Sequence, residues 1–223
     1  MPEFIQFAIP SAAMVCLKWW ATELILLFCG LLPNPQLETS VLSICLTTTS
    51  LHYFIPCSFS TAASTRISNE LGAGNPKAVR ISICAVFALA TVEFLLASAI
   101  IFCLRNVWGY AFTHEQEVVN LIEELTPLLC LSIILDSIIT LLAGVARGSG
   151  WQHIVAYVNL GAYYLIGIPA SLLMGFVLNW KEKGLWSGLI MGSVVQAILL
   201  SVVTYLTDWK KQVIIRLVVL SSC

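Results

Sequence analysis

Long apolar stretches separated by short polar connectors run through the whole chain. Since about 20 apolar residues cross a bilayer core of roughly 30 Å, each stretch is long enough for one transmembrane helix. Backbone polar groups in lipid must bond within the segment, and the stretches are too long for barrel strands, so we expect helices. The pattern predicts six spans, at residues 4–32, 38–65, 79–104, 117–146, 153–178 and 184–207.

The composition agrees with a protein that resides in lipid. Of the 223 residues, 59% are hydrophobic and 10% are charged, whereas soluble domains are about 25% charged. The net charge of −1 and the few charges, which cluster in short segments and form no basic face, argue against nucleic acid as a partner. The eight cysteines form no CxxC pair, so we predict no metal, cofactor or disulfide framework. The sequence therefore predicts an all-α integral membrane protein.

The two sides of the predicted bundle carry unequal positive charge. Six spans place the N-terminus, the second and fourth connectors and the C-terminal tail on one side, with Arg66, Lys77, Arg80, Arg147, Lys210, Lys211 and Arg216. The other side carries Arg105, Lys181 and Lys183. The positive-inside rule then predicts that both termini are cytoplasmic.

Each end of the chain carries a further expectation. The first residues lack the basic region and cleavage site of a secretory signal, so we expect the first span to stay in the membrane. We expect residues 1–207 to form a transmembrane lobe and residues 208–223 a short tail, cytoplasmic or interfacial, because the tail is too short to span.

Small residues and prolines predict how the helices pack. Glycines recur every fourth residue in two spans, at Gly144 and Gly148 and at Gly184, Gly188 and Gly192. Such seams let helix backbones approach closely, as static packing or as a sliding contact. Prolines are expected to interrupt helices at Pro10, Pro56, Pro127 and Pro169, and interrupted helices are common where transporters bind substrates.

Four ionisable residues lie well inside the predicted spans, namely Lys18, Glu23, Glu93 and Asp136. A charge at the bilayer centre costs about 2.5 to 3.5 kcal/mol on insertion scales, so such residues usually face the bundle interior and mark an ion or substrate route. Asp136 has the most apolar neighbours, a setting typical of carboxylates that exchange protons. The alternative is a buried hydrogen-bonding role.

The remaining intramembrane polar residues leave alternatives open. Glu23 lies one turn from Trp19 and Trp20, a setting that suits an organic cation or a place nearer the membrane interface. Lys18 is five residues from Glu23 and too far round the helix to pair with it, so it must find a partner on another helix. We expect Glu93 to be a packing acid and His52 a hydrogen-bonded helix histidine that shares a polar surface with residues 47–50.

Four motifs resemble one family of secondary transporters. The stretch AASTRISNELGAGNPKAVR, residues 62–80, resembles the signature of the multidrug and toxic compound extrusion (MATE) family in its plant, DETOXIFICATION-type form. The stretches LPNPQLETSVLSICL, LDSIITLLAGVARGSGWQ and YVNLGAYYLIGIP, at residues 32–46, 135–152 and 157–169, resemble the same family in order and spacing. The resemblance covers nearly the whole chain.

The resemblance implies a secondary active antiporter and not an enzyme. Family members have two lobes of six helices and exchange organic cations, alkaloids, flavonoids or organic anions for protons or sodium ions across plasma or vacuolar membranes. This chain resembles the C-terminal lobe alone. The resemblance thus implies half a transporter, from a fragmentary gene model, a truncated isoform or a degenerate copy, whose second lobe would lie on another chain or upstream in the same gene.

The same resemblance gives roles to single residues. In the plant family a CLEWW glutamate and the aspartate of LDS are regarded as an acidic pair for protons and substrate. Asp136 retains the aspartate, whereas Lys18 stands at the glutamate position. Our hypothesis is that Lys18 replaces a switchable acid with a fixed ion pair and favours anionic over cationic substrates. The resemblance also implies roles for four polar residues of the cytoplasmic connectors, namely Arg66, Asn69, Glu70 and Arg147. They would make gating or folding contacts, or anchor the chain at the lipid headgroups, and would not contact substrate.

Two other classes of protein compete with a transporter. Ser149 and His153 are four residues apart, but Arg147 stands where a rhomboid-like motif has glycine, so serine hydrolysis is weakly supported. The second alternative is a non-transporting membrane partner, or a degenerate half-transporter without coupling, that associates with another lobe.

Overall fold

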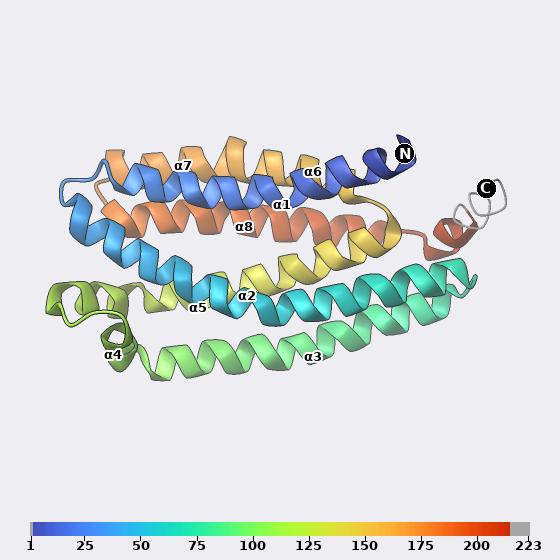
Figure 1. Cartoon of the computed structure of the whole chain (residues 1–223), viewed down its shortest axis with the longest axis horizontal. Coiled ribbons are helices and arrows are strands. Elements are labelled where there is room, and N and C mark those ends of the chain that lie inside the picture. The colour runs from blue at the N-terminus through green and yellow to red at the C-terminus, as the bar shows by residue number, and fades with distance from the viewer. Residues whose placement is uncertain (1, 215–223) are drawn as a thin grey trace.

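The computed structural model describes residues 2–214, which form helices joined by short connectors (Figure 1). The long helices are α1 (Pro2–Cys29), α2 (Pro35–Gly72), α3 (Pro76–Cys103), α5 (Gln116–Ser149) and α8 (Lys181–Leu206). The fifth span consists of α6 (Gln152–Asn159), the π-helix η2 (Leu160–Gly167), α7 (Ile168–Leu172) and the π-helix η3 (Leu173–Val177). Short α4 (Arg105–Trp108) and the 3₁₀ helix η1 (Gly109–Ala111) precede α5.

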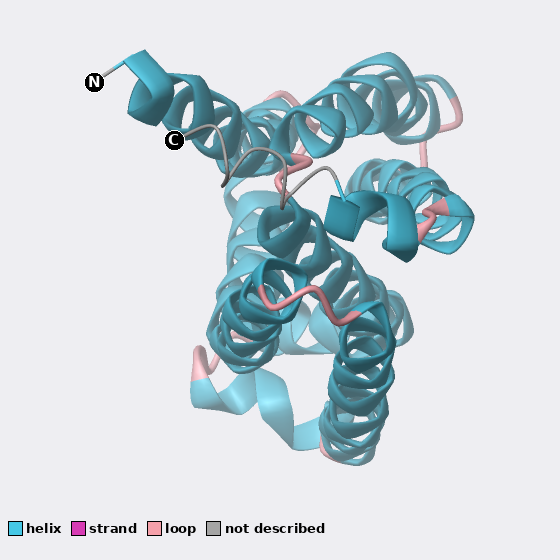
Figure 2. Ribbon diagram, turned by 90° about the vertical axis from the view of Figure 1, so that its right-hand side faces the viewer, coloured by secondary structure: helices cyan, strands magenta, loops and turns pink. Residues whose placement is uncertain are grey.

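The prediction of six apolar helical spans is confirmed. Six helices are long and apolar enough to cross a membrane, namely Ala8–Cys29, Pro35–Gly72, Pro76–Cys103, Gln116–Ser149, Gln152–Val177 and Lys181–Leu206. Large apolar side chains such as Leu165, Val177 and Ile81 are exposed on their outer faces, as expected of surfaces that contact lipid tails. Figure 2, viewed from the end that holds the termini, shows helices and no strand in the described part of the chain.

Several connectors are shorter than the sequence suggested. The second connector was expected to include Arg66 and Glu70, but α2 continues to Gly72. Pro76 then begins α3, and the side chain of Asn75 caps it by accepting a hydrogen bond from the Ala78 N–H. Proline and asparagine are favoured at these positions, so α3 begins almost at once. The segment after α3, expected to be a plain connector, contains α4 and η1.

Contrary to the prediction, most of the prolines do not interrupt their helices. Pro10, Pro56 and Pro127 lie inside α1, α2 and α5, which continue through them. The prediction is therefore wrong for helix continuity at these three positions, because an apolar environment and neighbouring helices support the remaining backbone bonds. Only the fifth span, which contains Pro169, alternates between α and π segments within residues 2–214.

The helices form two groups of three. In Figure 1, α1, the fifth span and α8 lie along one side, and α2, α3 and α5 along the other. Contacts between α5 and α8 form the main connection between the groups. Just over half of the most apolar part of α5 is buried, 56% against 22% to 33% in the other spans, so α5 is the central helix.

Glycine seams bring backbones together as predicted. A Cβ atom built on Gly148 of α5 would lie 2.6 Å from the Ser64 carbonyl oxygen of α2, and one on Gly184 of α8 would lie 2.5 Å from that of Met174. Real Cβ atoms do not approach so closely. The seams therefore fix the α2–α5 contact and the contact between α8 and the fifth span.

Both described ends of the chain lie at the same end of the bundle (Figure 1). After α8, residues 209–214 form a further helical turn. Trp209 stacks on Trp151 with ring centroids 5.7 Å apart and joins the hydrophobic core, together with Val213. The start of the tail thus packs on the bundle, whereas residues 215–223, with Arg216 and Cys223, lie outside the described residues.

Candidate functional site

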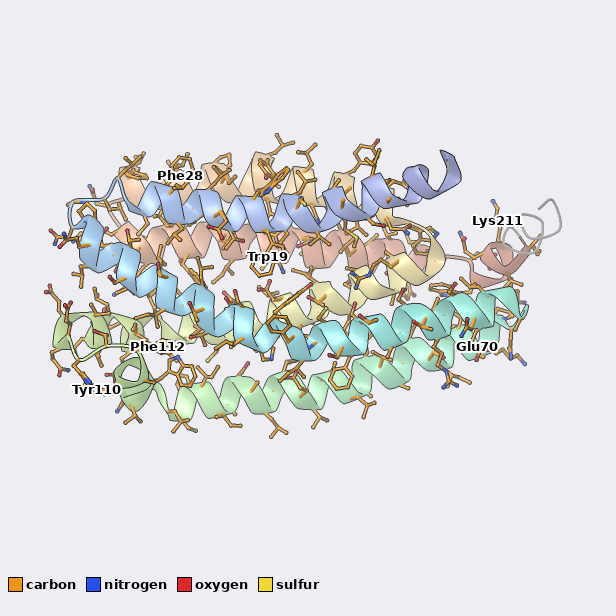
Figure 3. All side chains as sticks on the ribbon, viewed as in Figure 1. Trp19, Phe28, Glu70, Tyr110, Phe112 and Lys211 are labelled. Carbon is orange, nitrogen blue, oxygen red and sulfur yellow. The ribbon has the colours of Figure 1, made fainter. Side chains whose placement is uncertain are left out.

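A cavity lies between the two groups of helices. Its walls come from α1, α2, α5, α6 and α8, and it is lined by Met14, Val15, Lys18, Trp19, Thr22, Leu46, Thr49, Ser50, Tyr53, Asp136, Ile139, Thr140, Ala143, Arg147, Val155, Asn159 and Gln196. Its lining is mostly apolar with a few polar groups, as is typical of small-molecule sites. Figure 3 shows Trp19 near the middle of the length of the bundle.

Lys18 and Asp136 form an ion pair across this cavity. The Lys18 Nζ donates to the Asp136 Oδ1 over 2.8 Å and thereby joins α1 to α5. About a quarter of each side chain is exposed, 21% for Lys18 and 27% for Asp136. The sequence hypothesis that Lys18 approaches Asp136 from another helix therefore agrees with the geometry. Two opposite charges at this distance compensate each other, which lowers the cost of placing either in the membrane.

The same ion pair borders a second, smaller cavity. Lys18, Thr22, Leu46, Thr49 and Asp136 line both cavities. The second cavity continues toward Tyr163, Trp186 and Ser193 on the fifth span and α8. The ion pair thus lies where two open spaces in the lobe meet.

A chain of buried hydrogen bonds supports the wall beside the ion pair. The Tyr163 hydroxyl donates to Gln196 Oε1 over 2.7 Å, and the Gln196 amide donates to Asn159 Oδ1. The Asn159 amide in turn donates to the Met14 carbonyl over 2.6 Å. A chain in which each amide has a partner fixes α1, the fifth span and α8 relative to one another.

Arg147 also lines the cavity, although the sequence placed it in a cytoplasmic connector. It lies in the last turn of α5, which continues to Ser149. Its Nη2 donates to the Ser60 Oγ over 2.8 Å, and that hydroxyl donates to the Thr140 carbonyl. The expectation of a connector position is wrong because the helix stops only at its C-cap, Gly150, whose left-handed conformation (φ 86°) terminates α5 after Arg147.

Glu23 does not join the other two predicted site residues. It lies on α1 but is exposed on the outer surface of the lobe, and it lines neither cavity beside the ion pair. The five-residue separation from Lys18 directs the two side chains to different faces of the helix. Glu23 is therefore available to contact lipid or a neighbouring protein surface.

His52 and Glu93 pair with each other on a different face of α2. His52 Nε2 lies 2.9 Å from Glu93 Oε1 of α3, while Thr49, Ser50 and Tyr53 face the cavity. The expectation that His52 shares the polar surface of its neighbours is thus wrong, whereas its hydrogen-bonding role is as predicted. Glu93 Oε2 is buried without a hydrogen-bond partner in the described structure.

The residues named for serine hydrolysis have other arrangements. The Ser149 hydroxyl donates to the Val145 carbonyl of its own helix over 2.9 Å. His153 is exposed at the start of α6.

Among the residues that were expected in connectors, Arg66 donates through Nε to the Ser82 Oγ of α3 and lies 4.0 Å from Glu70, so it joins two helices.

Three cavity residues could have been found by a different reading of the sequence. Asn159 and Gln196 are uncharged polar residues within apolar spans, which is the signal of an interior contact. Arg147 follows Asp136 by eleven residues, or about three helical turns, so both lie on one face of a helix. Reading the helix as ending before Arg147 hid that relation.

A helical membrane lobe with a mostly apolar cavity and an intramembrane ion pair is typical of integral, multi-pass membrane proteins that handle small solutes. A protein-family model described as MatE matches residues 10–173. The chain belongs to this family, the multidrug and toxic compound extrusion transporters, whose members bind small-molecule substrates and are not enzymes.

Relatives from Arabidopsis thaliana agree over nearly the whole chain. Protein DETOXIFICATION 3 is 55% identical over 210 residues, which cover 94% of this chain and 44% of the relative. Protein DETOXIFICATION 14 is 53% identical over 212 residues, which cover 95% and 44%. The chain thus spans less than half the length of these relatives.

Solved structures share the fold. The crystal structure of the eukaryotic MATE transporter AtDTX14 matches with a TM-score of 0.93 and 52% identity, over 97% of this chain and 48% of that one. An outward-facing multidrug resistance MATE family transporter of the MOP superfamily matches with a TM-score of 0.78 at 12% identity, over 91% and 44%, which supports the fold alone.

Proposed function

We propose that this chain forms one lobe of a MATE-type antiporter that exports xenobiotics or secondary metabolites in exchange for protons, and that substrate enters the cavity beside Lys18 and Asp136. The observation that carries the proposal is the ion pair between α1 and α5 at the wall of the cavity between the two groups of helices. Residues 1–207 would form the lobe and residues 208–223 its short tail. A second lobe, on another chain or the same one, would complete the route.

The ion pair has a direct consequence for coupling. Exchange of a proton at Asp136 would cost the ionic contact with the Lys18 ammonium, 2.8 Å away. The pair thus acts as a fixed link between α1 and α5, in agreement with the hypothesis from the sequence. The carboxylate that exchanges protons is then expected outside this pair, on the complementary lobe.

Glu23 has a different part in the proposal. Its exposed position near Trp20, a residue with 60% of its surface exposed, suits contact with the complementary lobe. From that surface, Glu23 would face a cationic group on the opposite side of the route. It would not act together with Asp136.

A chimera provides the test. The half of Arabidopsis Protein DETOXIFICATION 3 that this chain does not match would be joined to this chain and reconstituted in liposomes with a pH gradient. Lys18→Glu is expected to raise the pH-dependent flux of ethidium, a cationic probe, several-fold, because two neighbouring carboxylates can share a proton. Asp136→Asn in the same variant should remove the gain.

Controls separate charge from coupling. Lys18→Gln removes the positive charge without supplying a carboxylate, so it should not gain pH dependence. Equal pH-dependent flux in the original chimera and in its Lys18→Glu variant would contradict the coupling hypothesis. If neither of these two chimeras moves ethidium or an organic anion, transport by this lobe is contradicted as well.

A non-transporting membrane partner is the alternative, and the locked ion pair favours it. In this case the lobe binds a two-lobed relative and contributes no flux of its own. Stable co-purification with Protein DETOXIFICATION 3, together with flux that Asp136→Asn in this chain leaves unchanged, would support the alternative.

We also propose that both termini are cytoplasmic and that the lobe resides in the plasma or vacuolar membrane.

A further inference from the structure

Arg147 is a cation of the cavity without an acidic partner. Its nearest hydrogen-bond partner is the neutral Ser60 hydroxyl, at 2.8 Å. None of the ion pairs among residues 8–214 includes it. A guanidinium has five N–H donors, so one bond to a hydroxyl leaves most of them free for a ligand.

The other charges of the cavity cancel. Of the residues that line it, Lys18, Asp136 and Arg147 carry charge at neutral pH. Lys18 and Asp136 neutralise each other at 2.8 Å. The cavity is therefore left with one net positive charge, which Arg147 provides.

The position of Arg147 leaves room for the body of a ligand. Asp136, Thr140, Ala143 and Arg147 follow one face of α5 and all line the cavity. At 1.5 Å per residue, Arg147 lies about 16 Å along the helix from Asp136. The wall of the same cavity includes Tyr53 and Trp19, whose rings meet edge to face with centroids 5.8 Å apart.

We propose that Arg147 forms an anion-binding subsite of this cavity, which receives the carboxylate or a similar anionic group of an aromatic organic acid. The planar guanidinium matches a carboxylate in a two-bonded arrangement. The apolar and aromatic wall holds the ring system. The inference rests on the proposed function and names the substrate class of the same cavity as organic anions.

Binding of two matched probes to the whole chain in lipid nanodiscs tests the subsite. The probes are 2-naphthoate and its neutral amide, 2-naphthamide, which share a ring system and differ in charge. Titration calorimetry, with protein-free nanodiscs as the blank, should give tighter binding of naphthoate. Arg147→Gln should weaken naphthoate binding about 10-fold, since hydrogen bonds to charged groups are the stronger ones, and should leave naphthamide unchanged.

Matched variants keep the test decisive. Arg66→Gln removes an arginine that bonds a serine outside the cavity, and it should bind naphthoate as the original chain does. Arg147→Lys keeps the charge and should retain part of the affinity for naphthoate. This variant still tests the subsite if Arg147→Gln fails to fold. Equal binding of both probes to the original chain, no binding of naphthoate, or undiminished binding by Arg147→Gln would overturn the subsite. The ethidium flux of the chimeras is independent of these results, so the proposed function can stand or fail separately.

Discussion

At the scale of single residues, the charges inside this lobe have three kinds of partner. Lys18 and Asp136 form an ion pair at the cavity, and His52 and Glu93 share a hydrogen bond between α2 and α3. Arg147 has only a neutral hydroxyl. A fully compensated pair links helices, whereas an uncompensated charge beside open space can attract a ligand.

His52→Ala tests the structural weight of the second pair. The substitution leaves both Glu93 carboxylate oxygens without a hydrogen-bond partner, because Oε2 already has none in the described structure. An unsatisfied buried acceptor costs about 1 to 3 kcal/mol, so we expect thermal unfolding in detergent to shift clearly downward. Differential scanning fluorimetry measures that shift.

The chain offers a matched control in another histidine. His153 is exposed at the start of α6, so His153→Ala should leave the unfolding temperature unchanged. Glu93→Leu combined with His52→Ala should recover part of the loss, since no orphaned carboxylate remains. A His52→Ala protein as stable as the original would show that the pair contributes nothing.

Residue chemistry in the sequence predicted some of the site. Lys18 had to find a partner on another helix because Glu23 lies on a different face, and the motif that contains Asp136 supplied the partner. Arg147 was assigned to a connector because of the polar cluster near it, whereas α5 continues through this cluster to Ser149. His52 was assigned to the wrong face, since neighbouring threonines and serines do not reveal helix rotation.

At the scale of helices, α8 depends on small residues for its contact with the fifth span. A Cβ atom on Gly188 would overlap the backbone and side chain of Ser171. The Ser171 hydroxyl also donates to the Leu185 carbonyl of α8 over 2.9 Å. Close packing and this bond hold α8 against α7.

Gly188→Ala should separate these helices. Overpacked cores lose about 1 to 3 kcal/mol, so we expect a lower unfolding temperature and earlier loss of monodispersity on size-exclusion chromatography. Gly161→Ala is the control, because a Cβ there meets nothing within 4 Å. Equal stability of the two variants would show that α8 can shift at no cost.

The helices themselves were the most predictable level of the structure. Apolar length alone placed all six spans, and the four-residue glycine spacing predicted their close contacts. The π-helical turns of the fifth span and the continuity of α2 through Pro56 were not predictable, because both depend on partners for backbone groups that neighbouring helices provide.

At the scale of the whole molecule, the distribution of connectors predicts orientation. The α2–α3 turn at Gly74 lies at the end of the bundle that holds both described termini, and the α1–α2 turn at Asn34 lies at the opposite end (Figure 1). The positive-inside rule predicts that the first of these ends is cytoplasmic.

Protease protection in sealed microsomes, whose outer face corresponds to the cytoplasm, checks this orientation. An epitope inserted at Gly74 should be digested, while the same epitope inserted at Asn34 should be protected until detergent opens the vesicles. Protection at Gly74 with digestion at Asn34 would reverse the orientation. Equal digestion at both sites would contradict the predicted spans.

Because both described ends lie on one side of the bundle, six-helix units of this kind can be copied head to tail without a further membrane crossing. A peptide that joins the end of one unit to the start of the next stays on a single face of the membrane. The copies would then share one orientation and be related by an axis along the membrane normal, as in parallel repeats, and not by inversion. Their cavities would open toward the same compartment at the same moment only if both copies rock together.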